Sequence, residues 1–222
     1  MIDILNKIYA LLQSCLDECA PGGKEKTLRS VILSIGDLCQ QLSQCGQEQE
    51  EQQQQQQQAS SLVSLTDFSQ WLGRVHDFLL LRDAGLRSVL LRAIRLSLPR
   101  MSPHAGSGSE SESASSSHAN DFSLPPPCPF CTLLVSHKIH LVAIHSLEKE
   151  HNSNWERMQA LKLMKRMLET SPASFPLAIA RSLVAIAQHS PDASASSSSS
   201  SSKQSQDSCR NICVEMLREL AL

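Results

Sequence analysis

The chain has 222 residues, in which twenty Lys and Arg stand against twenty-two Asp and Glu for a net charge of −2. No block of five or more basic residues occurs, so the charge pattern typical of nucleic-acid binding is missing. Hydrophobic residues make up 41% of the chain and aromatic residues only 4%, which favours helices over sheets. Composition therefore predicts a soluble helical protein that binds no nucleic acid.

Two apolar patterns with helical spacing predict an N-terminal helical pair over residues 1–45. The first pattern covers 2–19 and ends at Pro21 with two glycines, and the second covers 24–45. The first lacks a basic leader, and charged residues interrupt it, so we expect neither a signal peptide nor insertion into a membrane. We therefore expect a cytoplasmic protein whose eight cysteines are reduced.

Three polar, repetitive stretches are predicted to be disordered. They are a Gln-rich linker over 46–61 with an uninterrupted glutamine run at Gln52–Gln58, a Ser/Pro-rich insert over 100–127 and a Ser-rich insert over 190–206. Such segments bury too little apolar surface to offset the entropy of ordering. The rest of the chain is long enough to form a real hydrophobic core.

Helical patterns fill the segments between these inserts. The segment 62–99 is predicted to be a helical repeat, with Asp83 as the N-cap of its second helix. Further repeats are predicted over 128–189, with one helix from Cys131 to about Lys149, a second from about 154 and a third from Ile179. Asp207 or Ser208 is expected to cap a last helix within 207–222. No alternating strand pattern is present, so the predicted class is all-α.

Three of the predicted helices resemble one another. They read AGLRSVLLRAIRL from Ala84, ERMQALKLMKRML from Glu156 and RNICVEMLRELAL from Arg210, each with apolar residues at its third, eighth and thirteenth places. Their starts are 72 and 54 residues apart, or 44 and 37 without the two Ser-rich inserts. This approaches the period of about 40–47 residues of armadillo and HEAT units. We therefore predict a solenoid of stacked antiparallel helix pairs, with an unrelated bundle of amphipathic helices as the alternative.

The apolar stripe of the last helix continues to the end of the sequence. Leu217, Leu220 and Leu222 would leave an apolar end uncovered. Solenoids need polar end caps, so we expect further repeats beyond this segment and poor solubility of the segment alone.

The strongest candidate for metal binding is Cys128-Pro129-Phe130-Cys131, followed by His137, His140 and His145. Thiolate and imidazole are ligands that zinc prefers. However, only five residues separate Cys131 from His137, whereas a zinc finger leaves about twelve. A proline-rich loop entering a helix is favoured, and no metal or cofactor is predicted. The pairs Cys15/Cys19 and Cys209/Cys213 are expected to be small buried apolar residues.

The sequence contains none of the motifs that would indicate catalysis. The phosphate-binding loop, the dinucleotide fingerprint, the nucleophile elbow and the zinc-protease motif are all missing. No histidine has a nucleophile and a carboxylate at a suggestive spacing. We therefore predict that the chain is not an enzyme and has no catalytic residues.

Parts of the chain resemble a known family. The stretch RDAGLRSVLLRAIR at 82–95 resembles the R-x-A-G-L-R-x-x-x-R helix in the N-terminal armadillo-like region of the Rictor (Pianissimo) family. Residues 155–167 are similar to its E-R-x-Q-A-L-R-L-x-R-K-M helix, and 209–222 to the helix ending C-E-L-A-L. The resemblance covers about 62–98 and 137–222. The Gln tract, the Ser-rich inserts and Cys-Pro-Phe-Cys depart from the family pattern.

This resemblance implies a scaffold subunit of TOR complex 2 that supports signalling to AGC-family kinases. Its implied partners are the TOR kinase and the other subunits of the complex, with membrane association only through the complex. Catalysis belongs to the kinase, so no residue here inherits a catalytic role. Two alternatives stay open: an armadillo/HEAT adaptor of another pathway, and a small zinc-binding module at Cys128 and Cys131.

Overall fold

Helices form wherever apolar residues recur at helical spacing. The computed structural model describes residues 1–17, 24–53, 64–81, 83–99, 127–148, 154–176, 178–188 and 200–221. Its helices are α1 (Ile2–Asp17), α2 (Lys24–Gln53), α3 (Leu65–Leu79), α4 (Ala84–Ser97), α5 (Pro129–Ser136), α6 (Ile139–Glu148), α7 (Asn154–Thr170), the short 3-10 helix η1 (Pro172–Ser174), α8 (Ile179–Gln188) and α9 (Ser200–Ala221). These ranges hold no β-strand, which confirms the predicted all-α class.

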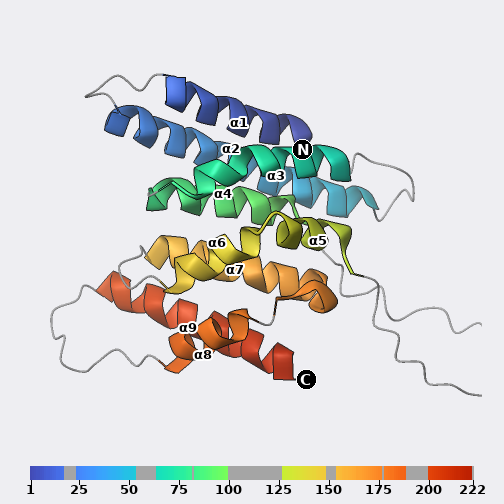
Figure 1. Cartoon of the computed structure of the whole chain (residues 1–222), viewed down its shortest axis with the longest axis vertical. Helices are drawn as coiled ribbons and strands as arrows, with labels where there is room; N and C mark the ends of the chain where they lie inside the picture. Colours follow the sequence, from blue (N-terminus) through green and yellow to red (C-terminus); the bar gives the residue numbers. More distant parts are fainter. Residues whose placement is uncertain are drawn as a thin grey trace, which may run out of the picture.

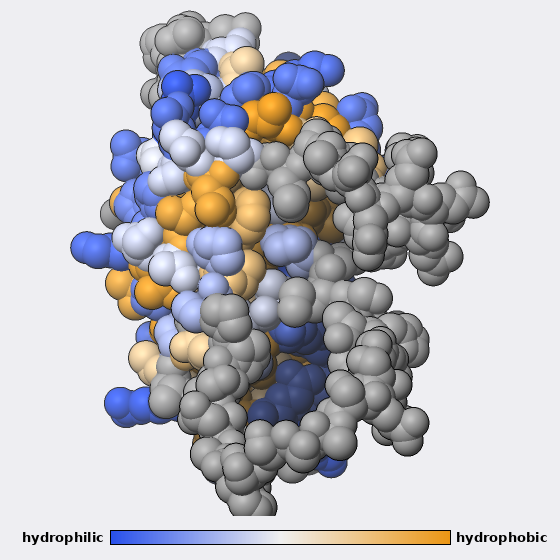
Figure 2. All heavy atoms as spheres, turned by 90° about the vertical axis from the view of Figure 1, so that its right-hand side faces the viewer, coloured by the Kyte–Doolittle hydropathy of each residue, from blue (hydrophilic) through white to orange (hydrophobic). Residues whose placement is uncertain are grey.

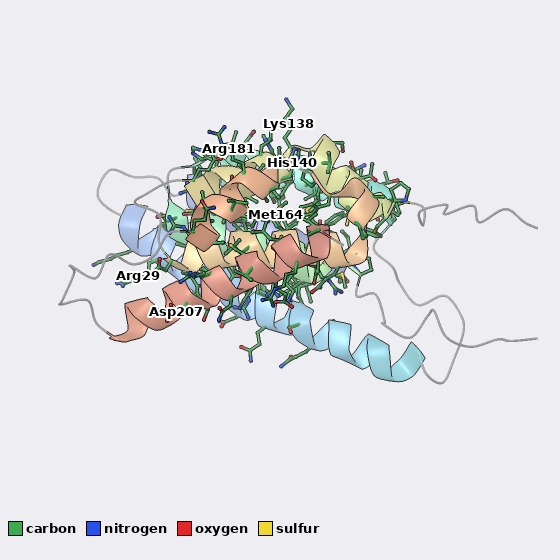
Figure 3. The ribbon with its side chains drawn as sticks, turned by 90° about the horizontal axis from the view of Figure 1, so that it is seen from below. Arg29, Lys138, His140, Met164, Arg181 and Asp207 are labelled. Carbon is green, nitrogen blue, oxygen red and sulfur yellow. The ribbon has the colours of Figure 1, made fainter. Side chains whose placement is uncertain are left out.

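The helices are stacked in two layers (Figures 1 and 3). The first layer contains α1, α3, the α5–α6 segment and α8, while the second contains α2, α4, α7 and α9. Each part of the first layer packs on the helix that follows it in the second layer, so the chain advances one pair at a time. The stack of helix pairs is the arrangement predicted from the sequence.

The three similar helices α4, α7 and α9 all lie in the second layer, where α7 packs between the other two. At the aligned apolar places, Leu91 and Leu163 are fully buried. In α9 the aligned residues Ile212 and Leu217 are only half-buried, because that helix buries Cys213 instead. The similarity of the three segments therefore places their helices in one layer correctly. It predicts only in part which residues of α9 are buried.

The core lies between the two layers and runs along the stack. Trp71 of α3 is among its largest fully buried side chains, and its indole N–H donates to the carbonyl of Leu5 at 2.7 Å. The rings of Phe68 and Phe130 lie 5.4 Å apart between α3 and α5. Met164 of α7 lies in the interior, between the two layers (Figure 3). Burial of these side chains joins neighbouring pairs into one body.

Side-chain caps determine where α3 and α4 begin. The carboxylate of Asp83 accepts from the backbone N–H of Leu86 at 2.7 Å, which confirms the predicted N-cap. The hydroxyl of Ser64 accepts from the N–H of Asp67 at 3.1 Å, so α3 begins at Leu65.

The single helix predicted from Cys131 to about Lys149 is wrong. The structure has two helices there, α5 and α6, which meet at a bend of 67°. The backbone of Lys138 has a φ of 58°, a left-handed conformation that ends α5 in the manner of a glycine cap. No glycine marks the break. The bend lets α5 pack on α3 while α6 packs on α7 and α8.

The predicted boundaries of two low-complexity segments are also wrong. Helix α2 continues to Gln53, inside the predicted linker 46–61. Helix α9 begins at Ser200, inside the predicted insert 190–206, rather than at a cap on Asp207 or Ser208. Neither extension contains a proline, and Gln, Glu and Lys are good helix formers. Residues 54–63, 100–126 and 189–199 lie outside the described ranges, so the remaining disorder predictions are not addressed.

Among the described helices, none alone is long and apolar enough to cross a membrane. The bent pair α5–α6 reaches the required combined length and apolarity.

Candidate partner-binding surface

A buried ion pair joins α4 to α7. The guanidinium of Arg87 donates through Nε to Oε1 of Glu156 at 2.7 Å and through Nη2 to Oε2 at 3.1 Å. The Arg87 side chain is 6% exposed and that of Glu156 0%. Ser146 of α6 donates to the same Oε1 at 2.7 Å, and Arg87 also donates to the carbonyl of Leu81. Each charge is therefore compensated in an interior where an unpaired ion would be very costly.

The ion pair lies in the two helices that carry the family resemblance. Arg87 belongs to the stretch 82–95, and Glu156 is the second residue of the stretch 155–167. Sequence reasoning missed their contact. Glu156 lies four and seven residues before the buried Ala160 and Leu163, which places it on the buried stripe of α7. A charged residue on such a stripe was the signal for a buried partner.

The same two helices carry most of the positive charge of the second layer. We call this group the basic cluster; it consists of Arg92, Arg95, Arg157, Lys162, Lys165 and Arg166. Helix α4 has no acidic residue, and one of the two in α7 is the buried Glu156. Lys162 is exposed, and Arg92 is partly exposed beside Cys39 of α2. This part of the second layer therefore presents excess positive charge to solvent.

One member of the basic cluster is held on α9. The ammonium of Lys165 lies 2.6 Å from a carboxylate oxygen of Glu215 and 3.8 Å from one of Glu169. The hydrogen bond to Glu215 raises the pKa of Lys165, as do the nearby carboxylates, while burial opposes the change. These carboxylates offset the charge of Lys165, whereas Arg92 and Lys162 form no ion pair with another described residue.

Two large apolar side chains of the second layer are exposed. Leu33 of α2 is 67% exposed, and Trp155 at the start of α7 is 53% exposed. Tryptophan and arginine are enriched among the residues that dominate protein–protein binding. An exposed tryptophan on a helix that also carries a basic cluster is therefore a candidate contact surface for a protein partner.

The first layer offers a contrasting surface. Lys138 and Arg181 point outward on that side of the molecule, away from Arg29 and Asp207 of the second layer (Figure 3). Both side chains are exposed. Figure 2 views the side of the stack that lies on the right in Figure 1, where apolar side chains lie in separate groups among hydrophilic ones.

The residues that the sequence offers as zinc ligands do not come together at one site. His137 shares a hydrogen bond with the hydroxyl of Ser69 at 3.0 Å, which directs its ring toward α3. His140 is partly buried and bonded to the backbone of Leu134, while His145 is exposed. Within the described ranges, no three His, Cys, Asp or Glu side chains are placed to hold a metal ion. Cys128 and Cys131 do lie close together, on the first turn of α5.

The predicted burial of the other cysteine pair is confirmed. Cys209 and Cys213 are both buried on α9, and burial raises the pKa of Cys213 to about 12. Cys15 is half-buried, and Cys19 lies outside the described ranges.

Comparison with known proteins identifies a family for the C-terminal part of the chain. The family model described as rapamycin-insensitive companion of mTOR, N-term, matches residues 128–222. This range contains α5 to α9, including Glu156 and most of the basic cluster. No curated protein and no solved structure matched the chain. The resemblance proposed for about 62–98 lies outside the match and stays a prediction. Residues 128–222 belong to the N-terminal region of the Rictor family.

Proposed function

We propose that the chain is a non-catalytic scaffold segment of TOR complex 2, acting in TOR kinase signalling to AGC-family kinases through protein–protein contacts. The observation that carries the proposal is the match of residues 128–222 to the N-terminal model of a companion of mTOR. The stack of helix pairs supports it, because stacked repeats form extended surfaces suited to binding other proteins. The cytoplasm is the proposed location, with membranes reached only through the complex.

The proposed contact surface is the second layer around α4 and α7. There the basic cluster lies on the helices joined by the Arg87–Glu156 pair, which fixes one helix against the other. Trp155 adds an exposed aromatic side chain at the start of α7. The charge of this surface favours a partner segment rich in Asp and Glu, because complementary charge accelerates encounter and excludes wrong partners.

The first experiment is a pull-down of the tagged native full-length protein from its own cells, with mass spectrometry of the recovered proteins. Recovery of a TOR kinase without the subunits particular to TOR complex 1 is the expected result. Failure to recover the kinase with well-folded bait would reject the proposal. The chain would then be a helical-repeat adaptor of another pathway.

Two charge-matched double variants test the contact surface. Arg92→Glu with Lys162→Glu reverses charge on the second layer, whereas Lys138→Glu with Arg181→Glu makes the same change on the first. We expect the first variant to lower recovery of the partner by about tenfold or more, since like charges across an interface cost several kcal/mol. The control should bind normally. Equal losses in both variants would contradict this surface without affecting the family assignment.

A further inference from the structure

Cys128 and Cys131 form the first turn of α5. Cys128 is the N-cap, Pro129 follows at the first helical position, and Cys131 lies at the third. The N–H of Thr132 donates to the carbonyl of Cys128 at 3.0 Å, which fixes the cap in place. N-cap and third-position side chains face each other in a helix start, as in the capping box.

The two thiols lie close together on the first turn of α5 and differ in their surroundings. Cys131 is fully buried, whereas Cys128 is partly exposed. Burial raises the pKa of Cys131 to about 12, and the neighbouring Cys128 acts in the same direction. Cys131 therefore holds its proton at neutral pH.

This asymmetry suits thiol–disulfide exchange. An accessible cysteine at a helix N-terminus can react with a disulfide in solution, because the helix dipole favours a negative charge there. A buried neighbour on the same helical turn can then displace the bound thiol. The bridge would join the N-cap and the third residue of one helix by a sulfur–sulfur bond of about 2.05 Å.

We propose that Cys128 and Cys131 are a reversible dithiol–disulfide site whose co-reactants are low-molecular-weight disulfides such as glutathione disulfide. The Cys128 thiolate attacks one sulfur of the small disulfide, forms a mixed disulfide and releases one small thiolate. Cys131 then gives its proton to that thiolate, attacks the Cys128 sulfur and releases the second small group as a thiolate, which takes up a proton from water. Two protein thiols are oxidised to one disulfide while one small disulfide is reduced to two thiols.

The site lies at a junction of several elements. The backbone N–H of Cys128 donates to the hydroxyl of Ser171, after α7, at 3.0 Å. Phe130, between the two cysteines, packs on Phe68 of α3. Oxidation would therefore fix the start of α5 where the first layer meets the end of α7.

The chain contains its own control pair. Cys209 and Cys213 lie four residues apart on α9, and both are buried. Neither begins a helix, and neither is accessible for the first attack. They should stay reduced under conditions that oxidise Cys128 and Cys131.

The test equilibrates the full chain in glutathione buffers of increasing oxidising ratio, followed by acid quench, alkylation and trypsin digestion. The peptide 101–138 contains Cys128 and Cys131 and no other cysteine, while Cys209 and Cys213 fall in separate peptides. We expect peptide 101–138 to carry no alkyl group and to have the mass of the reduced, unalkylated peptide less two hydrogens. The control cysteines should remain alkylated.

Two single variants separate the steps. Cys131→Ser should trap glutathione on Cys128, and Cys128→Ser should leave Cys131 reduced. Full alkylation of peptide 101–138 at the most oxidising ratio would overturn the proposal. So would a lasting glutathione adduct on Cys128 in the unmodified sequence, or equal oxidation of the control pair.

Discussion

The Arg87–Glu156 pair illustrates how a buried charge depends on its partner. Glu156 has both carboxylate oxygens occupied by Arg87, and Ser146 shares one of them. Removing either ion would leave the other charged in an apolar interior. The stability of the α4–α7 junction should therefore respond strongly to single changes and weakly to replacement of both ions.

We expect Glu156→Gln to lower the free energy of unfolding by about 3–5 kcal/mol, because it strands the guanidinium of Arg87. The double variant Arg87→Met with Glu156→Leu should recover most of that loss, since apolar residues of similar volume can replace a buried ion pair. Urea denaturation followed by circular dichroism measures both. A Glu156→Gln protein within about 1 kcal/mol of the parent would show that the pair is not desolvated as described.

His140 should make stability depend on pH. Burial lowers its pKa, and the hydrogen bond to the Leu134 backbone opposes this only in part. As pH falls, His140 of the unfolded chain therefore binds a proton near the ordinary histidine pKa of about 6.5. In the folded chain His140 binds its proton only at a lower pH. The free energy of unfolding should fall as pH drops from 7.5 through this range. In His140→Gln that slope should be smaller, as measured by urea titrations at several pH values, and an unchanged slope would assign the effect elsewhere.

At the scale of elements, the break between α5 and α6 has a local cause. Lys138 adopts a left-handed conformation that costs a residue with a side chain about 1–2 kcal/mol. The turn is retained because α5 and α6 pack on different helices. Tertiary packing therefore overrides the local preference of this residue.

Replacing Lys138 with Gly should raise the free energy of unfolding by about 0.5–1 kcal/mol, because glycine adopts positive φ without steric cost. Ser136→Gly, within α5, is the control and should lower it by roughly 0.5–1 kcal/mol. Thermal and urea unfolding of both variants distinguish the two positions. A loss of stability in Lys138→Gly would mean that the turn is not strained.

Within the described part of the chain, each helix pair packs mainly on its neighbours, as in other repeat proteins. Helices α4 and α7 have second-layer neighbours on both sides, whereas the main packing partners of α1 among the described helices are α2 and α3. Openings that expose α1 therefore disrupt fewer contacts than openings that expose α7.

Native-state hydrogen exchange should reveal this gradient. We expect the amides of α1 to exchange through openings of lower free energy than those of α7. Leu12→Ala, which removes a buried side chain from α1, should lower protection in α1 by about 2–5 kcal/mol and leave α7 nearly unchanged. Equal loss in both helices would indicate a single cooperative unit rather than a stack of separable pairs.

The sequence by itself determined the helical class, the Asp83 cap and the membership of α4, α7 and α9 in one repeated set. These features depend on local chemistry: apolar spacing, a carboxylate before a helix, and a repeat period close to that of stacked pairs. Local chemistry also singled out Cys128 and Cys131, as a candidate for metal binding that the spacing of the histidines then disfavoured.

Only the tertiary structure decided which charged residues are buried and where the fifth predicted helix bends. Arg87 and Glu156 are 69 residues apart, and their contact exists only because α4 packs on α7. Lys138 adopts its left-handed turn because α5 and α6 pack on different neighbours. Both features arise from long-range packing energies, which residue spacing along the chain does not encode.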